Sequence, residues 1–118
     1  MWRELGGLDE RFHPLWFEDV DFCLRLKQAG CAIVFEPRCR FRHHGGHSLD
    51  SVTFADRQLF WYRNLLYYVR KNLGFAAALM MRLMISAGAG GRMAAFVVRG
   101  DFSRAGAFGA VIRMAWSA

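Results

Sequence analysis

The chain has 118 residues, which is enough for one small domain with a modest hydrophobic core. Apolar residues make up 54% of it and charged residues 22%, a composition that excludes an intrinsically disordered segment. The net charge of +6 comes from residues 48–118, because residues 1–47 carry seven basic and seven acidic side chains. A neutral part followed by a basic apolar part predicts chemistry in the first and attachment to an anionic surface in the second.

The beginning of the chain shows none of the regions that make up a secretory signal peptide. The three cysteines, Cys23, Cys31 and Cys39, are spaced eight residues apart, which is neither a redox pair nor a zinc-ligand spacing. We therefore expect reduced thiols and a cytoplasmic location. Because the sequence enters at once into what reads as the middle of a domain, we also expect a fragment of a longer protein.

Residues 6–10 predict a turn near the beginning of the chain. Gly6 and Gly7 either form a plain tight turn or let the backbone approach a ligand closely. Trp16, which comes just before the first predicted helix, either stacks on a ligand or packs in the core.

An amphipathic helix is predicted from residue 17 or 18 to residue 29, because its apolar residues recur with a period of 3.6. Glu18, Asp19 and Asp21 fall in its first turn, where the helix macrodipole favours negative charge. These carboxylates are either capping and surface groups or an active-site base with its neighbours. Asp21 either caps the helix or pairs with Arg25 four residues later.

Two β-strands are predicted after this helix. Residues 31–35 form a short apolar run rich in β-branched and aromatic side chains, which is typical of a buried strand. Residues 38–43 alternate between arginine and less polar side chains, which predicts a second strand with one basic edge. A loop with two glycines follows, and it contains three histidines that are candidate ligands for a first-row metal. These histidines are His43, His44 and His47.

The pattern from residue 53 to residue 72 is again helical, and Gly74 is expected to break this helix. Arg63 and Arg70 share a face, which is either a solvated basic surface or a contact for diphosphate or lipid phosphate.

The apolar run of residues 75–86 precedes a glycine-rich stretch, residues 87–91, that reads as a hinge. A membrane span needs about 20 apolar residues, whereas this run has 12 and contains Arg82. Three readings stay open: a span, an amphipathic element in the membrane interface, and an ordinary packed helix.

Four motifs follow one another in order and at compatible spacing. They are Gly6-Gly7-Leu8-Asp9-Glu10-Arg11-Phe12, Phe17-Glu18-Asp19-Val20-Asp21-Phe22-Cys23-Leu24-Arg25, His43-His44-Gly45-Gly46-His47-Ser48 and Arg63-Asn64-Leu65-Leu66-Tyr67-Tyr68-Val69-Arg70-Lys71. Over about residues 3–72 the chain thus resembles the C-terminal half of bacterial family-two glycosyltransferases of the rhamnosyltransferase-like branch. The resemblance implies an α/β chain forming the C-terminal part of a GT-A fold, followed by amphipathic helices. It assigns an acceptor-side catalytic part to residues 1–50, a closing helix to 51–74 and a basic apolar tail to 75–118.

The chemistry that the resemblance implies is inverting transfer of a sugar from a nucleotide diphosphate sugar to an acceptor hydroxyl. It assigns the general base to Asp19. A divalent metal, Mg²⁺ or Mn²⁺, would be held mostly by a nucleotide-binding half that these 118 residues lack, with His43 as a ligand ahead of His44 and His47. The remaining donor or acceptor contacts would be Gly6, Gly7, Trp16, Glu18 and Asp21.

Two functions follow from the sequence. The first is a glycosyltransferase of cell-surface polysaccharide synthesis, active only with an upstream half and acting on a saccharide or lipid-linked acceptor at the inner membrane face. The second is a non-catalytic remnant that serves as a membrane-surface or partner-binding module. Nucleic acid is not an expected partner, because the basic residues are interleaved with apolar helices.

Overall fold

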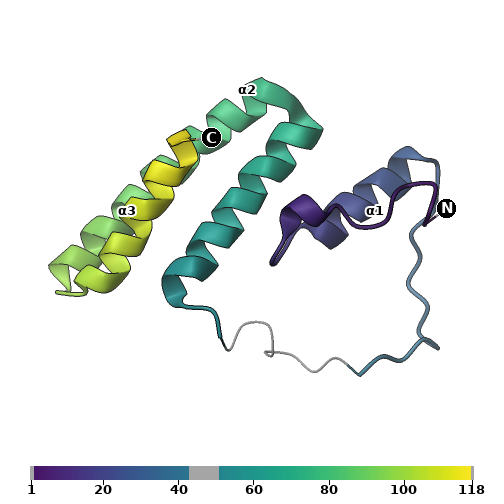
Figure 1. Ribbon diagram of the computed structural model, residues 1–118, viewed down its shortest axis with the longest axis horizontal. Helices are drawn as coiled ribbons and strands as arrows, with labels where there is room; N and C mark the ends of the chain where they lie inside the picture. The colour runs from purple at the N-terminus through teal and green to yellow at the C-terminus, as the bar shows by residue number, and fades with distance from the viewer. Residues whose placement is uncertain (1, 43–50, 118) are drawn as a thin grey trace.

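The computed structural model describes residues 2–42 and 51–117, and its regular elements are all helical (Figure 1). A single 3₁₀ turn, η1 (Glu10–Phe12), precedes α1 (Glu18–Gln28). The long α2 (Phe54–Val98) and α3 (Phe102–Ser117) follow. No β-strand forms within the described ranges, so the predicted α/β fold of GT-A type is wrong for this part of the chain.

Helix α1 confirms the helix predicted from the acidic motif. Its first turn holds the three carboxylates and its last turn holds Arg25 and Lys27, an arrangement that complements the macrodipole. The helix ends at Gln28, and the φ of +79° at Gly30 allows the amide of Cys31 to donate to the carbonyl of Leu26.

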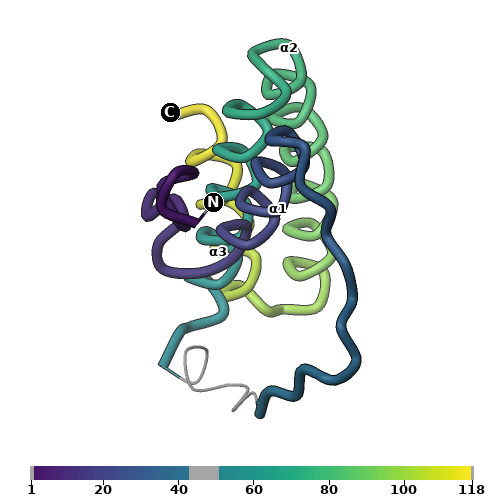
Figure 2. Tube along the Cα trace, turned by 90° about the vertical axis from the view of Figure 1, so that its right-hand side faces the viewer, coloured from purple at the N-terminus to yellow at the C-terminus, as the bar shows by residue number. Residues whose placement is uncertain are grey.

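The two predicted strands are replaced by an irregular segment, residues 31–42, which runs outside the helices (Figures 1 and 2). Its apolar side chains face solvent, and Phe35 and Phe41 are 91% and 90% exposed. An extended chain becomes a strand only when a neighbour takes up its backbone hydrogen bonds. No such neighbour lies beside this segment in the described part of the chain.

Helix α2 consists of two arms that meet at Gly74. Thr53 caps the first arm, residues 54–73, by accepting a hydrogen bond from the amide of Asp56 at 3.1 Å. Gly74 has φ 85° and ψ −175°, which no helix contains, and the second arm, residues 75–98, turns back beside the first (Figure 1). The break expected at Gly74 is therefore confirmed.

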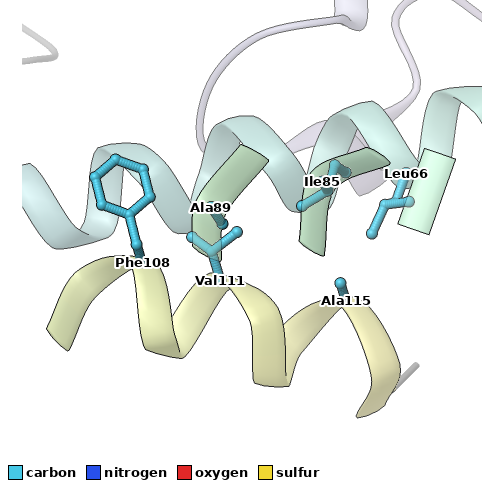
Figure 3. Packing of buried hydrophobic residues seen from close by; sticks show 6 residues of the cluster. All are labelled: Leu66, Ile85, Ala89, Phe108, Val111 and Ala115. Atoms are coloured by element: carbon cyan, nitrogen blue, oxygen red, sulfur yellow. The ribbon is translucent and has the colours of Figure 1, made fainter. Parts of the chain in front are cut away.

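The hinge expected at residues 87–91 is wrong, because the second arm stays helical through all five residues. Their small side chains instead allow α3 to approach closely. Ala89 is fully buried in a cluster with Val111 and Ala115, and Leu66, Ile85 and Phe108 complete that cluster (Figure 3). The main core thus lies between both arms of α2 and α3.

Candidate functional site

A buried ion-pair network joins α1 to the first arm of α2. The side chain of Asp21 is fully buried, and Arg25 Nε and Lys71 Nζ each lie 2.8 Å from it. Asn72 donates a third hydrogen bond to this carboxylate at 3.2 Å. Burial alone would raise the pKa of Asp21, but the bonds from Lys71, Asn72 and Arg25 outweigh it and lower the pKa. Asp21 is therefore a charged group that fixes α1 against α2.

Asp9 is a second anion in the same network, and the sequence did not point to it. Its carboxylate accepts from Arg11 at 3.1 Å, from the Tyr67 hydroxyl at 2.8 Å and from Lys71 at 2.8 Å. The hydrogen bond from Arg11 is the main reason why the pKa of Asp9 lies far below its usual range. Burial and the neighbouring Asp9 raise the pKa of Tyr67. Lys71 is thus shared between Asp9 and Asp21.

Arg25 explains the conformation of the glycine turn. Besides binding Asp21, the Arg25 guanidinium donates to the carbonyls of Leu5 at 2.5 Å and Gly7 at 2.6 Å. Gly6 and Gly7 both have positive φ, and a Cβ on Gly7 would stand 3.2 Å from the Trp2 ring. In the structure, therefore, both glycines serve a tight turn held by Arg25.

The loop before α1 is shaped by Asn64, which is 1% exposed on the first arm of α2. Its amide nitrogen donates to the carbonyls of Phe12, Leu15 and Trp16. Arg63, the preceding residue, donates to the carbonyl of His13. These contacts hold a loop that ends in two strained residues directly before the acidic motif.

Those two residues are Trp16 and Phe17, with φ values of 70° and 74°. Left-handed backbone at a non-glycine residue costs about 1–3 kcal/mol and persists only where the surroundings fix it. Here Trp61 fixes it, because its ring lies 5.6 Å from that of Trp16 and 5.1 Å from that of Phe17. Trp16 is therefore packed, though half-buried, at the entrance to α1.

The remaining acids of the motif differ sharply from Asp21. Asp19 is exposed, and one of its oxygens accepts from the adjacent amide of Val20 at 2.8 Å. Glu18 is half-buried, and its Oε2 is buried without a hydrogen-bond partner among the described residues. Glu18 lines a pocket of about 560 Å³ together with His13 and Pro14 from the preceding loop. The motif thus presents one exposed carboxylate, one at a pocket wall and one locked in an ion pair.

The metal-binding prediction falls outside this region. His43, His44 and His47 are not among the described residues. Within residues 2–42 and 51–117, no three side chains of the histidine, cysteine or carboxylate type lie close enough together to hold a metal ion. The described residues therefore do not form a metal site, and the metal stays a prediction.

Arg63 and Arg70 lie apart from the acidic motif in the sequence but line one groove. Its volume is about 560 Å³, and Arg11, Arg82, Leu66 and Met114 also line it. Arg63 contacts the ring of Phe60, and the Arg70 guanidinium lies 5.0 Å from the centre of the Phe75 ring. Both arginines thus line one groove, which a shared contact with phosphate would require.

Comparison with known proteins gives two relatives. N-acetylglucosaminyl-diphospho-decaprenol L-rhamnosyltransferase from Mycobacterium tuberculosis matches in the strains CDC 1551 / Oshkosh and ATCC 25618 / H37Rv. Each is 32% identical over 94 residues, which cover 67% of this chain but only 30% of the relative. No protein-family model matches the chain, and no solved structure matches it significantly. The chain is therefore related, distantly and over part of its length, to a glycosyltransferase.

Proposed function

We propose that this chain supplies the acceptor-side part of an inverting glycosyltransferase, with Asp19 as the general base. The observation that carries the proposal is the 32% identity to a rhamnosyltransferase over 94 residues. Because the chain spans 30% of that relative's length, the groups that bind the sugar nucleotide would come from polypeptide outside these 118 residues.

The reaction would be a single displacement. The Asp19 carboxylate takes the proton of the acceptor hydroxyl, and the hydroxyl oxygen forms a bond to the anomeric carbon of the donor sugar. The bond from that carbon to the diphosphate oxygen breaks, and the nucleoside diphosphate leaves with the electron pair. Attack from the face opposite the leaving group inverts the anomeric configuration.

The environment of each carboxylate supports Asp19 as the base. A general base must be ionised and within reach of the proton that it removes. Asp21 is fully buried and bound by Arg25, Lys71 and Asn72, so its oxygens are not available to an acceptor. Asp19 is exposed on the first turn of α1, where an acceptor hydroxyl can reach its carboxylate.

Glu18 and Trp16 would bind and orient the acceptor and would not take part in the proton transfer. Glu18 lines the pocket beside the motif with an unpartnered oxygen, which suits a hydrogen bond to an acceptor hydroxyl. Trp16 is half-buried beside the same motif, where the exposed part of its ring is available to a sugar. The acceptor of the relative, as its name states, is linked to decaprenol through a diphosphate, and we propose a lipid-linked saccharide here too.

The test is Asp19→Asn in the protein that contains this chain together with its donor-binding part. Loss of a general base lowers the rate about 10²–10⁴-fold, so transfer should fall at least 100-fold while binding of the sugar nucleotide is unchanged. Asp56→Asn is the matched control, because Asp56 also lies in a first helical turn and an amide there still accepts from Thr53. Equal turnover in Asp19→Asn and the unmodified protein would remove Asp19 as the base.

A non-catalytic role is the second candidate. It is favoured by the second arm of α2, where large apolar side chains are exposed. Sequencing the DNA upstream of the Met1 codon separates the two candidates. A longer reading frame with a nucleotide-binding segment supports the enzyme, whereas a frame that starts at Met1, with no partner that restores transfer, supports the module.

A further inference from the structure

The groove lined by four arginines adjoins an exposed apolar surface, and the two features together suggest a ligand. In α2 the second arm exposes Phe75, Leu79, Met80, Leu83 and Met84, which are between 41% and 66% accessible. Among the described residues, α2 contains the one stretch that is long and apolar enough to cross a membrane, and only 17% of that stretch is buried. A core helix of a soluble domain would be mostly buried, so this surface calls for another apolar contact.

Arg82 connects the groove to this surface. It lines the groove, and residues three or four positions away on a helix are its neighbours. Arg82 therefore has Leu79 on one side and Ser86 on the other. Trp116, which is half exposed on α3, donates from its indole nitrogen to the Ser86 hydroxyl at 2.9 Å. An indole beside arginines and exposed aliphatic side chains is typical of the interface between lipid and water.

The charge of the groove favours an anion. Arg63 donates to the carbonyl of His13 and to the amide oxygen of Asn64, and Arg70 lies against the Phe75 ring. All these partners are neutral, so neither guanidinium charge is balanced by a carboxylate in the described part of the chain. Arg11 contributes less, because Asp9 binds it.

Phe75 joins the two features directly, since its ring contacts Arg70 of the groove while 66% of the residue remains exposed. Guanidinium groups recognise phosphate oxygens by paired hydrogen bonds, and long apolar side chains beside them suit acyl chains. We propose that this groove and the adjoining arm of α2 bind the phosphate headgroups of an anionic membrane surface, with Phe75 and Leu79 inserted among the lipid chains. The proposal does not depend on sugar transfer.

The experiment is sedimentation of the 118-residue chain with vesicles of phosphatidylcholine and phosphatidylglycerol in equal amounts. A basic side chain near an anionic membrane contributes about 1 kcal/mol, so Arg70→Gln and Arg82→Gln should each lower the partition coefficient about fivefold. Arg99→Gln is the matched control: it removes the same charge from the far end of the second arm and should change binding less than twofold. Circular dichroism checks that each variant keeps its helices.

Further measurements decide which ligand occupies the groove. Phe75→Ser should also weaken vesicle binding, because it removes the apolar contact without changing the charge. Equal loss in Arg99→Gln would show attraction to net charge alone and overturn the groove. Equal binding to pure phosphatidylcholine would overturn the anionic headgroup. Binding of inorganic pyrophosphate that depends on Arg70, without vesicle binding, would assign the groove to a free phosphate and overturn the membrane proposal.

Discussion

At the scale of single residues, three neighbouring acids have three different roles. Asp21 is buried and holds two helices together, Glu18 borders a pocket, and Asp19 faces solvent. The pairing of Asp21 with Arg25 was one of two readings of the sequence, since four residues separate them on a helix. The pairing with Lys71 was not predictable, because the partners are 50 positions apart and no local pattern links them.

Among the partly exposed residues of the network, Lys71 should be the one whose substitution lowers the unfolding free energy most. Its side chain is 24% exposed and binds both Asp9 and Asp21, so Lys71→Met leaves two carboxylates with one cation fewer. Removing one partner of a buried ion pair costs about 3 kcal/mol of unfolding free energy. Urea unfolding followed by circular dichroism measures this loss.

Lys27→Met serves as the matched substitution, because Lys27 is exposed near the end of α1. A surface change of this kind stays within about 0.5 kcal/mol. If Lys71→Met were as mild as Lys27→Met, the network would be a surface feature rather than the attachment of α1.

At the scale of elements, the helices were predicted better than the segment between them. Helix α1 and the break at Gly74 follow from local signals: periodicity, charge placement and a glycine. Residues 31–42 carry an equally clear local signal for strands, yet they are irregular, because a strand depends on a partner that the local sequence does not contain. The hinge predicted at residues 87–91 was wrong for a related reason, since glycines that favour a hinge also permit tight helix packing.

Gly74 and Gly90 should respond in opposite ways to alanine. A Cβ meets no atom within 4 Å at either position, so backbone conformation alone decides the result. At Gly74, φ 85° with ψ −175° is accessible essentially only to glycine, and Gly74→Ala should lower the unfolding free energy by about 1–3 kcal/mol. At Gly90, inside the helix, alanine should raise it by about 0.5–1 kcal/mol.

Denaturation midpoints of the two variants, measured side by side, give the comparison. A stabilised Gly74→Ala would mean that the two arms of α2 form one straight helix in solution.

At the scale of the whole molecule, two helical units are joined by polar and aromatic contacts. The arms of α2 and α3 share an apolar core, whereas residues 2–28 attach to the first arm through the hydrogen bonds of Asp9, Asp21 and Asn64 and through ring contacts of Trp16 and Phe17. The sequence predicted α1, the first arm of α2 and the break at Gly74, whereas the catalytic role of Asp19 stays a prediction. The sequence did not predict the union of the two units, which rests on hydrogen bonds between residues 48 to 62 positions apart.

This union should make the fold sensitive to acid. The pKa values of Asp9 and Asp21 are lowered in the folded chain, so their contribution is complete above the ordinary carboxyl pKa of about 4 and is lost as the pH falls through the folded values. Urea midpoints should therefore be level near neutral pH and drop steeply below about pH 4. Asp21→Asn should start lower and drop less, and an unchanged acid slope in that variant would exclude Asp21 as a source of the sensitivity.

Because residues 31–42 are largely exposed, the chain can be cleaved there. Arg38 stands in this segment with 87% of its side chain in solvent, within ready reach of a protease. A cut there would separate α1 from α2 in sequence but would leave every bond made by Asp9, Asp21 and Asn64 in place. We therefore expect fragment complementation: residues 1–38 and 39–118, made as separate peptides, should reassemble through these contacts.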